Sequence, residues 1–216
     1  RWKRIIAAAN ALQPDVHVLM GDYLASHRFS TGKVSFEQVA EAALDLKSTL
    51  GTFAIMGNHD WWDDPKIQLT GRGIPHAQQV FGDAGLRVLD NEAVELKKAG
   101  MPFWLSGTNS LVAIRKGHRK FDSRANISQA LAKINNDAPI IHLAHEPDLF
   151  VEVPDRVSLT LSGHTHGGQI RLFGFSPVTP SSFGNRFAYG HVIEEGRHLV
   201  VSGGLGCSRI PVRFGV

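Results

Sequence analysis

Hydrophobic and polar residues alternate along the chain between a helical and an extended pattern. The apolar residues between positions 2 and 12 follow the i, i+3, i+4, i+7 spacing of an amphipathic helix, and Pro14 ends that pattern. The next apolar run, residues 16–20, is short and stops at Gly21-Asp22. Such a run is typical of a buried strand, so the first two predicted elements are a helix and a strand.

The same alternation continues towards the middle of the chain. Ser35 and Gln38 form a capping box, which predicts a second helix. Residues 52–56 have the pattern of the next buried strand. Two extended segments, residues 92–96 and 102–105, are joined by a short connection that contains a glycine, which predicts an antiparallel hairpin.

The second half of the chain repeats these patterns. A third helix is predicted to begin near Asp122 or Ser123, either of which can cap it. Two more buried strands are predicted at residues 139–144 and 157–161. Residues 189–202 have the pattern of a second hairpin.

Helix-linked strands followed by hairpins predict an α/β fold with two packed mixed sheets and helices outside them. No internal repeat or linker divides the sequence, so we expect residues 1–216 to form a single domain. The composition is that of an ordinary globular protein, with 43% apolar and 20% charged residues and a net charge of +3.

Composition and charge exclude several classes of protein. The apolar fraction is too high, and the net charge too low, for a disordered chain. Basic residues are scattered, which argues against a dedicated nucleic-acid binder, and no apolar run reaches the roughly 18 residues of a membrane span. One cysteine, Cys207, excludes an intramolecular disulfide framework. The eleven histidines are unusual, because His is a common ligand for metals and carrier of protons.

Side chains of types that can bind a metal follow four of the predicted strands, at the point where each strand ends. Ligands of α/β sheets bind beyond the carboxyl ends of strands, so side chains from distant parts of the sequence can meet there. Each residue alone is weak evidence, because a turn explains Asp22 or Asn58 better and surface His pairs occur by chance, but chance does not readily produce the ordered series. The series consists of Asp22, Asn58, His145 and the pair His164 and His166.

These residues lie in four motifs: Gly21-Asp22, Gly57-Asn58-His59-Asp60, His145, and Gly163-His164-Thr165-His166. In this order the motifs resemble the calcineurin-like metallophosphoesterase superfamily, and the resemblance covers nearly the whole chain. Further stretches are similar to a bacterial branch that contains membrane-associated phosphoesterases, among them UDP-2,3-diacylglucosamine pyrophosphatases. These stretches are residues 143–148, 162–170, 204–206 and 211–215.

The resemblance implies a four-layer α-β-β-α sandwich and a site for two divalent metal ions. By position, Asp22 would bridge both ions, and His166 would bind one of them. Asn58, His145 and His164 would complete the shell of the other. A hydroxide that bridges the ions would attack phosphorus. Nitrogen and oxygen donors without thiolate suit Mn, Fe, Co or Zn and do not choose among them.

Four further residues are assigned to catalysis and substrate binding. By resemblance, His59 would hydrogen-bond the phosphoryl oxygen or protonate the leaving group, with Asp60 or a backbone group orienting it. Trp61, which follows this motif directly, and Arg213 are assigned to substrate binding. Packing of Trp61 in the core is an equally good interpretation.

One motif of the family is missing. The family opens with Asp-x-His upstream of Gly-Asp, a place that would lie ahead of Arg1. Asp15-Val16-His17 matches the string, but Asp15 would lie at the far end of the strand from Asp22, roughly 20 Å away. We therefore expect a chain that is truncated at both ends and, expressed alone, nearly inactive.

Three other features have competing interpretations. His142 would face the opposite side of a strand from His145, so we assign the metal to His145. The apolar loop at residues 173–187 can fold over its own small core or contact an acyl chain or a membrane surface. The basic cluster at residues 115–120 can be a solvated loop or attract an anionic lipid surface.

The sequence thus predicts a metal-dependent hydrolase of a phosphodiester or pyrophosphate bond, with a lipid or nucleotide-lipid as substrate. The alternatives are a phosphomonoesterase or protein phosphatase, or a non-catalytic remnant of the fold. A phosphorylated small molecule or lipid is the expected partner, with peripheral membrane contact and without nucleic acid. By resemblance the location would be the bacterial cytoplasm or its membrane; the oligomeric state and the metal stay open.

Overall fold

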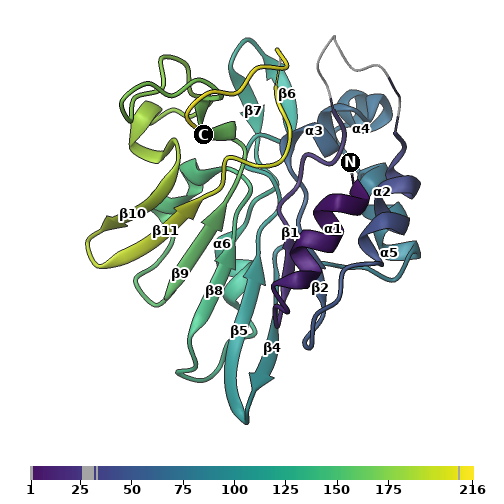
Figure 1. The fold of residues 1–216 in the computed structure, drawn as a ribbon, viewed down its shortest axis with the longest axis vertical. Coiled ribbons are helices and arrows are strands. Elements are labelled where there is room, and N and C mark those ends of the chain that lie inside the picture. Colours follow the sequence, from purple (N-terminus) through teal and green to yellow (C-terminus); the bar gives the residue numbers. More distant parts are fainter. Residues whose placement is uncertain (1, 26–31, 33, 209) are drawn as a thin grey trace.

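The computed structural model describes residues 2–25, 32, 34–208 and 210–216. Two β-sheets pack against each other and helices lie outside them, as Figure 1 shows. Among the described residues, no helix is long and apolar enough to cross a membrane. The α/β fold predicted from the sequence is confirmed.

The smaller sheet has three strands in the order β1-β2-β3, and both of its pairings are parallel. The strands predicted at residues 16–20 and 52–56 are confirmed in shorter form, and β3 has only two residues and was not predicted. The strands are β1 (His17–Leu19), β2 (Thr52–Ala54) and β3 (Arg87–Val88).

The larger sheet has six strands in the order β10-β11-β9-β8-β5-β4, and it is mixed. Its two outer pairs are the predicted antiparallel hairpins, and its inner pairings are parallel. The strands are β4 (Glu92–Lys98), β5 (Met101–Gly107), β8 (Ile140–Leu143), β9 (Leu159–Ser162), β10 (Gly190–Glu194) and β11 (Arg197–Val201).

Five helices lie on the side of the smaller sheet, to the right in Figure 1. Their apolar faces, with Val39 and Phe81 fully buried, form a core with the outer face of that sheet. Ser35 caps the second of them in the predicted capping box with Gln38. The helices are α1 (Trp2–Ala11), α2 (Phe36–Ala43), α3 (Asn58–Trp62), α4 (Pro65–Thr70) and α5 (His76–Asp83).

Two further cores complete the layers. Ile55, Leu105 and Leu143 lie in the core between the two sheets. On the outer face of the larger sheet, a third core contains Ile140 and Phe150, under α6 (Ile127–Leu131) and the 3-10 helix η1 (Pro147–Glu152). Helices, sheet, sheet and helices therefore form the expected four layers.

The third predicted helix is shorter than expected and begins later. Its N-cap is Asn126, whose side chain accepts the N–H of Gln129, and not Asp122 or Ser123. Asp122 instead ends β7 (Lys120–Asp122), which pairs with β6 (Ile114–Gly117) in a separate ribbon at the top of Figure 1. The basic cluster at residues 115–120 is therefore a β-hairpin.

The loops that leave β1, β2, β8 and β9 meet at one edge of the two sheets. The carbonyl of Met20, directly after β1, binds the side chain of His145, two residues after the end of β8. Asp15 lies before β1 and binds Thr49 and Lys98 at the other end of the strand. This arrangement is the physical reason why Asp15-Val16-His17 does not contribute to the site.

Candidate metal centre

Four of the five expected ligands meet at this edge. The Asp22 Oδ2 and His145 Nε2 atoms are 3.2 Å apart, and the His164 Nδ1 and Asn58 Oδ1 atoms are 2.7 Å apart. Single donor atoms of Asp22, His145 and His164 all lie within 4.8 Å of one another. The cluster joins residues more than 100 positions apart in the sequence, as the strand-end pattern predicts.

The backbone at the candidate ligands is itself unusual. Asp22, His164 and His166 have positive φ values of 58°, 64° and 52°. Asp and His tolerate this left-handed conformation better than most residues, but it still carries strain. Strained non-glycine residues are frequent at functional sites, where the surrounding structure holds them in place.

Two glycines allow the loops to approach each other closely. A Cβ atom at Gly57 would lie 2.4 Å from Asp22 Oδ1 and 2.6 Å from His145 Cε1. A Cβ atom at Gly21 would lie 2.3 Å from the backbone nitrogen of Gly57, and Gly21 has a φ of 93°. Larger residues at these two positions would separate the loops that carry the ligands.

The orientation of His145 suits a metal ligand. Its Nδ1 atom lies 2.6 Å from the carbonyl oxygen of Met20, so Nδ1 carries the proton and donates it. Its Nε2 atom faces Asp22, is buried, and makes no directed hydrogen bond among the described residues. A backbone carbonyl that holds Nδ1–H in this way is the usual support for a histidine that binds metal through Nε2.

Asp22 and His145 shift each other's pKa. Burial acts to lower the pKa of His145, but the Asp22 carboxylate beside it raises that pKa to about 10. Burial acts to raise the pKa of Asp22, but the positive charge of His145 brings it well below its ordinary value. Asp22 is therefore a carboxylate at neutral pH, and a divalent cation can take the place of the proton on His145.

Asp60 has a different position from the one expected. Its carboxylate accepts the backbone N–H groups of Gly57, Asp22 and Tyr23, at 2.8, 2.9 and 3.1 Å. Burial and the neighbouring Asp22 carboxylate raise the pKa of Asp60 to about 7. Among the described contacts of Asp60, none reaches the ring of His59, so Asp60 acts as a positioning residue that ties the two ligand loops together.

His59 lies next to the cluster and its ring is free to act. Its backbone N–H donates to Asp22 Oδ1 at 2.8 Å. Its ring packs edge-on against Trp62, with ring centroids 5.0 Å apart. Its Nδ1 atom is buried and has no hydrogen-bond partner among the described residues. Trp62, and not Asp60, is therefore the side chain seen to support the His59 ring.

The two histidines of the last motif have different positions. Burial lowers the pKa of His164, which lies in the cluster. His166 is not a member of the close group, although its pKa responds to both Asp22 and His164. It begins the 3-10 helix η2 (His166–Gly168), and its Nδ1 atom is buried without a partner among the described residues.

The two residues assigned to substrate binding are occupied elsewhere. Trp61 is buried in the core, and its Nε1–H donates to Asn109 Oδ1 at 2.6 Å. The Arg213 guanidinium donates to the carbonyl oxygens of Gly203, Gly204 and Gly206. Each of the two uses its polar atoms to hold its own surroundings, and neither belongs to the close group of ligands, so their role in substrate binding stays a prediction.

The loop after β5 supports the site and was missed from the sequence. Glu146 follows His145 directly and is buried, and it accepts Ser110 Oγ–H at 2.5 Å and the N–H of Leu111 at 2.9 Å. Asn109 in the same loop binds Trp61 of α3. A buried acid next to a predicted ligand was the available signal, but its partners lie 36 positions away.

His142 has a separate and structural position. Its Nδ1 atom lies 2.8 Å from Ser106 Oγ, on the neighbouring strand β5. Its side chain is buried, and burial lowers its pKa to about 4. His142 is thus a neutral residue of the sheet, and His145 lies in the cluster.

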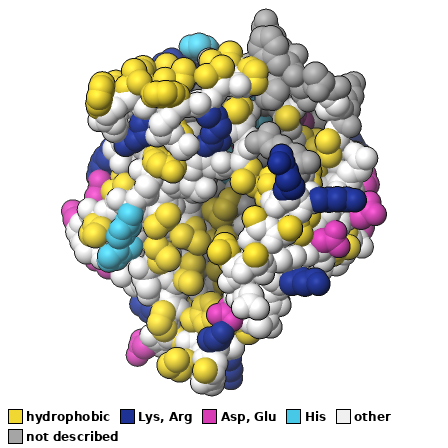
Figure 2. Space-filling view, in the orientation of Figure 1, with side chains coloured by type: hydrophobic (Ala, Val, Ile, Leu, Met, Phe, Trp, Pro, Cys, Tyr) yellow, Lys and Arg dark blue, Asp and Glu magenta, His cyan; other side chains and the backbone are white. Residues whose placement is uncertain are grey.

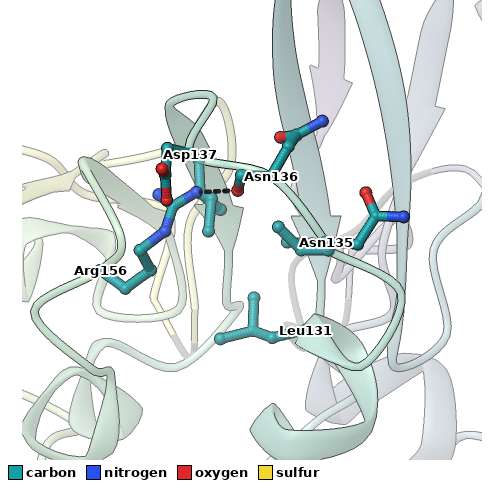
Figure 3. Close-up of a pocket in the computed structure, with 7 residues that line it drawn as sticks. Leu131, Asn135, Asn136, Asp137 and Arg156 are labelled. Carbon is teal, nitrogen blue, oxygen red and sulfur yellow. Dashed lines mark hydrogen bonds between the residues drawn. The ribbon is translucent and has the colours of Figure 1, made fainter.

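A surface hollow elsewhere does not carry this chemistry. Figure 3 shows this hollow of about 430 Å³ beside the end of α6, with Arg156 donating to the carbonyl oxygen of Asn136 at 2.6 Å. None of the expected site residues lines it. Its lining residues are Leu131, Ile134, Asn135, Asn136, Asp137, Ile140 and Arg156.

The donor set fits a divalent metal ion. One carboxylate, one amide oxygen and two imidazoles converge, and His145 Nε2 faces Asp22 Oδ2 at 3.2 Å without a directed hydrogen bond. This mixture of nitrogen and oxygen donors without thiolate suits Mn, Fe, Co or Zn. Asp22, Asn58, His145 and His164 are the residues that would hold the ion.

Comparisons with known proteins agree with this chemistry. The family described as Calcineurin-like phosphoesterase matches residues 1–168. An uncharacterized metallophosphoesterase of Aquifex aeolicus (strain VF5) is 28% identical over 94% of this chain and 69% of its own length. The metallophosphoesterase YkuE of Bacillus subtilis (strain 168) is 28% identical over 98% of this chain and 68% of its own.

A relative from Danio rerio is named a transmembrane protein with metallophosphoesterase domain. It is 30% identical over 99% of this chain, which spans 46% of that protein. None of these three names states a substrate, so the narrower resemblance to UDP-2,3-diacylglucosamine pyrophosphatases stays a prediction.

Solved structures are similar in fold at low sequence identity. Haemophilus influenzae NAD nucleotidase (NadN) has a TM-score of 0.53 and 15% identity, over 93% of this chain and 43% of that one. Thermus thermophilus sulfate thiohydrolase SoxB has a TM-score of 0.54 and 11% identity, over 93% and 36%. With the converging ligands and the family match over residues 1–168, these findings lead to one conclusion. The chain belongs to the calcineurin-like phosphoesterase family, whose members are metal-dependent hydrolases of phosphoester bonds.

Proposed function

We propose that this protein hydrolyses a phosphodiester or pyrophosphate bond at the cluster of Asp22, Asn58, His145 and His164. The observation that carries the proposal is the convergence of Asp22, His145 and His164 within 4.8 Å, with His145 Nδ1–H held by a backbone carbonyl. A bound divalent metal ion would act as a Lewis acid on the phosphoryl oxygen and lower the pKa of water.

The chain's own residues hold and orient this centre. Asp22 brings the negative charge, and its position depends on the bond from its own N–H to Asp60. The imidazoles of His145 and His164 add ligands without neutralising the charge of the cation. A second ion, as expected from the sequence, would share Asp22 and use His166, whose Nδ1 atom is buried without a partner among the described residues.

His59 is the proposed acid. The expectation is supported by its place beside Asp22 and by its ring, which Trp62 contacts and whose Nδ1 atom has no partner among the described residues. A positioned histidine can donate a proton to the leaving oxygen near neutral pH. Asp60 contributes by fixing the loop that precedes His59.

A lipid or nucleotide-lipid is the proposed substrate class. Exposed apolar side chains follow the last histidine motif along the chain, among them Phe173 and Phe175. A relative named as a transmembrane protein shares the domain, which supports a membrane setting for the family's chemistry. A phosphomonoester substrate stays the alternative, because the ligand set alone does not select the leaving group.

The experiment compares hydrolysis of bis-p-nitrophenyl phosphate, p-nitrophenyl phosphate and a lipid pyrophosphate by the full-length protein, with Mn, Co, Zn or no metal. Metal-dependent hydrolysis that favours the diester or pyrophosphate supports the proposal. Preference for the monoester selects the alternative, and no hydrolysis with any metal makes the chain a non-catalytic remnant.

Asp22→Asn provides the residue-level test. The amide keeps the size of the side chain and loses its charge, so we expect bound metal to fall and nearly all metal-dependent turnover to disappear. Metal content by mass spectrometry and the rate are measured on the same sample. Asp83→Asn, on an exposed position of α5, is the control and should change neither. Retention of both properties in Asp22→Asn would refute the role of Asp22.

A further inference from the structure

We propose that the end of the molecule carrying the metal centre binds the surface of a bilayer that contains anionic lipids. The turn at Phe173 and Gly174 would enter the bilayer, and the β6–β7 hairpin would contact lipid headgroups. The inference rests on the proposed function, because it places the enzyme where a lipid phosphoester is found.

The turn at Phe173 presents an aromatic ring in an unusual way. Leu172 and Phe175 exchange two backbone hydrogen bonds of 2.9 Å, which leaves Phe173 and Gly174 at the tip. Both tip residues have positive φ, 49° and 83°, as in a type I′ turn. Asn or Asp is normally found at the first position, and a bulky residue there is strained.

The ring of Phe173 gains nothing from the protein in return. Its side chain is fully exposed, with a relative accessibility of 109%. A strained position that holds a large apolar side chain in water has two costs and no visible benefit within the fold. Both costs are explained if the Phe173 ring is buried in a lipid bilayer in the functional state of the protein.

Phe173 belongs to a larger apolar patch formed by two segments. Phe214 of the C-terminal segment donates its N–H to the Gln169 carbonyl and accepts the N–H of Arg171, each at 2.8 Å, so the segments lie side by side. We define the apolar patch by the exposed residues of both: Leu172, Phe173, Phe175, Val178, Val212 and Phe214.

Charge around the patch is positive. The sequence contains no Asp or Glu between Asp155 and Glu194, and none after Glu195. Arg171 and Arg213 flank patch residues in the sequence. Figure 2 shows hydrophobic side chains gathered at the upper left of the molecule, with Lys and Arg just below them.

The β6–β7 hairpin adds a second positive element. Residues 115–120 contain four Lys or Arg residues, all exposed, and Lys116 forms an ion pair with Asp122. The hairpin lies at the top of the view in Figure 1, at the same end as the C-terminal segment. It is also close to the site, because the Arg115 guanidinium lies 3.9 Å from the centroid of Trp62, which contacts His59.

A bilayer fits these features. Anionic lipids attract basic residues near the surface, and aromatic or aliphatic side chains enter the boundary between headgroups and acyl chains. A single ring that protrudes from a tight turn can enter the fluid interior of a bilayer without a pocket of matching shape. The patch and the hairpin would also bring His59 and the metal ligands to the plane where lipid phosphates lie.

The experiment measures binding of the protein to vesicles. Vesicles of phosphatidylcholine alone are compared with an equimolar mixture of phosphatidylcholine and phosphatidylglycerol, by sedimentation at low and high salt. We expect binding to the anionic vesicles that weakens with salt. Absence of binding to the anionic vesicles, or equal binding to both kinds, would overturn the proposal.

Variants locate the contact. The double variant Phe173→Ser, Phe175→Ser should reduce vesicle binding by about tenfold or more, because it loses the two aromatic rings whose transfer from water into the bilayer favours binding. Met101→Ser removes an apolar residue of comparable exposure, 68%, at the β4–β5 turn and should bind as the wild type does. Equal loss in both variants, or in neither, would contradict the assignment of the patch.

The depth and charge contributions are tested separately. Phe173→Trp should show a blue-shifted emission with anionic vesicles and quenching by brominated lipids. Arg119→Glu with Lys120→Glu should weaken binding and flatten its salt dependence. If Trp at position 173 keeps an unshifted emission in protein that sediments with the vesicles, another surface of the protein contacts the bilayer. That result would contradict insertion of the patch.

Failure of this proposal differs from failure of the proposed function. The double serine variant should hydrolyse soluble bis-p-nitrophenyl phosphate at the wild-type rate, since neither residue contacts the metal cluster. Soluble turnover without vesicle binding overturns the membrane surface alone. Vesicle binding without turnover under any metal overturns the hydrolytic function alone.

Discussion

Asp22 is constrained by three residues from two separate segments. His59 donates its backbone N–H to Oδ1, His145 Nε2 lies 3.2 Å from Oδ2, and Asp60 accepts the N–H of Asp22 itself. A change at any of these contacts therefore acts on the charge that a metal ion would meet. His59, the proposed acid, is thus the direct neighbour of Asp22, the proposed metal ligand.

His59→Ala should separate these two roles. The backbone N–H that Asp22 accepts remains in the variant, so bound metal should stay nearly unchanged. The rate should fall by about 10²–10⁴-fold, the usual effect of a positioned acid or base. The loss should be smaller for p-nitrophenol as leaving group, because it needs little protonation.

Steady-state rates on activated and unactivated diesters, with metal content, make the comparison. His191→Ala, an exposed residue of β10, is the matched control. Loss of metal in His59→Ala would make His59 a ligand, and an equal rate loss on all leaving groups would indicate charge stabilisation instead of proton donation.

His142 should make the fold sensitive to acid. Burial lowers its pKa to about 4 in the folded state, whereas the unfolded state binds the proton near its ordinary pKa of 6.5. The stability is therefore complete above pH 6.5 and is lost as the pH falls towards 4. At about 1.4 kcal/mol per pKa unit, the loss amounts to about 3 kcal/mol.

Urea unfolding at pH 7.5 and 4.5 measures this effect. His142→Gln keeps a polar side chain of similar length without a titrating group, so its difference in stability between the two pH values should be smaller than that of the wild type by that amount. The same pH difference in both proteins would show that other groups, such as Asp22 and His145, dominate the acid response.

At the level of elements, the site depends on how closely two loops approach. Gly57→Ala should lower metal affinity by about 10–100-fold, because its Cβ would press on Asp22 and His145 and turn them away from the ion. Gly82→Ala is the control, since a Cβ there meets nothing within 4 Å inside α5. It should keep metal affinity and add roughly 0.5–1 kcal/mol of stability.

Isothermal titration with Mn, together with thermal melts, reports on both variants. Wild-type affinity in Gly57→Ala would mean that the two loops separate without moving the ligands. The proposed coupling between the loop approach and the metal site would then be wrong.

Elements formed by interactions between residues close in the sequence could be predicted, and elements formed by distant interactions could not. Local signals such as the capping box at Ser35 and the two hairpins identify their elements directly. β3 has only Arg87 and Val88, too few residues for a periodic pattern, and depends on pairing with β2. Asn126 caps α6 because β7 takes the residues before it, a tertiary effect that no local pattern contains.

The site was predictable as a set of residue types and less so in its details. The ordered motifs correctly indicated that Asp22, Asn58, His145 and His164 meet. Consecutive residues of a helix point about 100° apart, so only one of Trp61 and Trp62 can face the core. Tertiary packing decides that Trp61 does so and that Trp62 contacts His59. His166 lies outside the close group, in a left-handed turn with Gly167 that the residue types do not reveal.

At the scale of the whole molecule, chemistry and surface properties gather at one end. The strand-end loops, the β6–β7 hairpin and the apolar patch all lie away from the β4–β5 turn at the bottom of Figure 1. The core between the two sheets joins the layers from which the strand-end loops emerge. An enzyme built in this way can present its metal centre to a surface while the opposite end of the molecule faces the solvent.

The most direct test of the metal centre is anomalous diffraction from crystals of the protein soaked in Mn, recorded at the manganese absorption edge. We expect a strong peak bounded by Asp22, Asn58, His145 and His164, and a weaker second peak on the side of His166. A manganese peak only at other residues, or no peak at all in crystals that bind Mn in solution, would contradict the assignment of this cluster as the metal site.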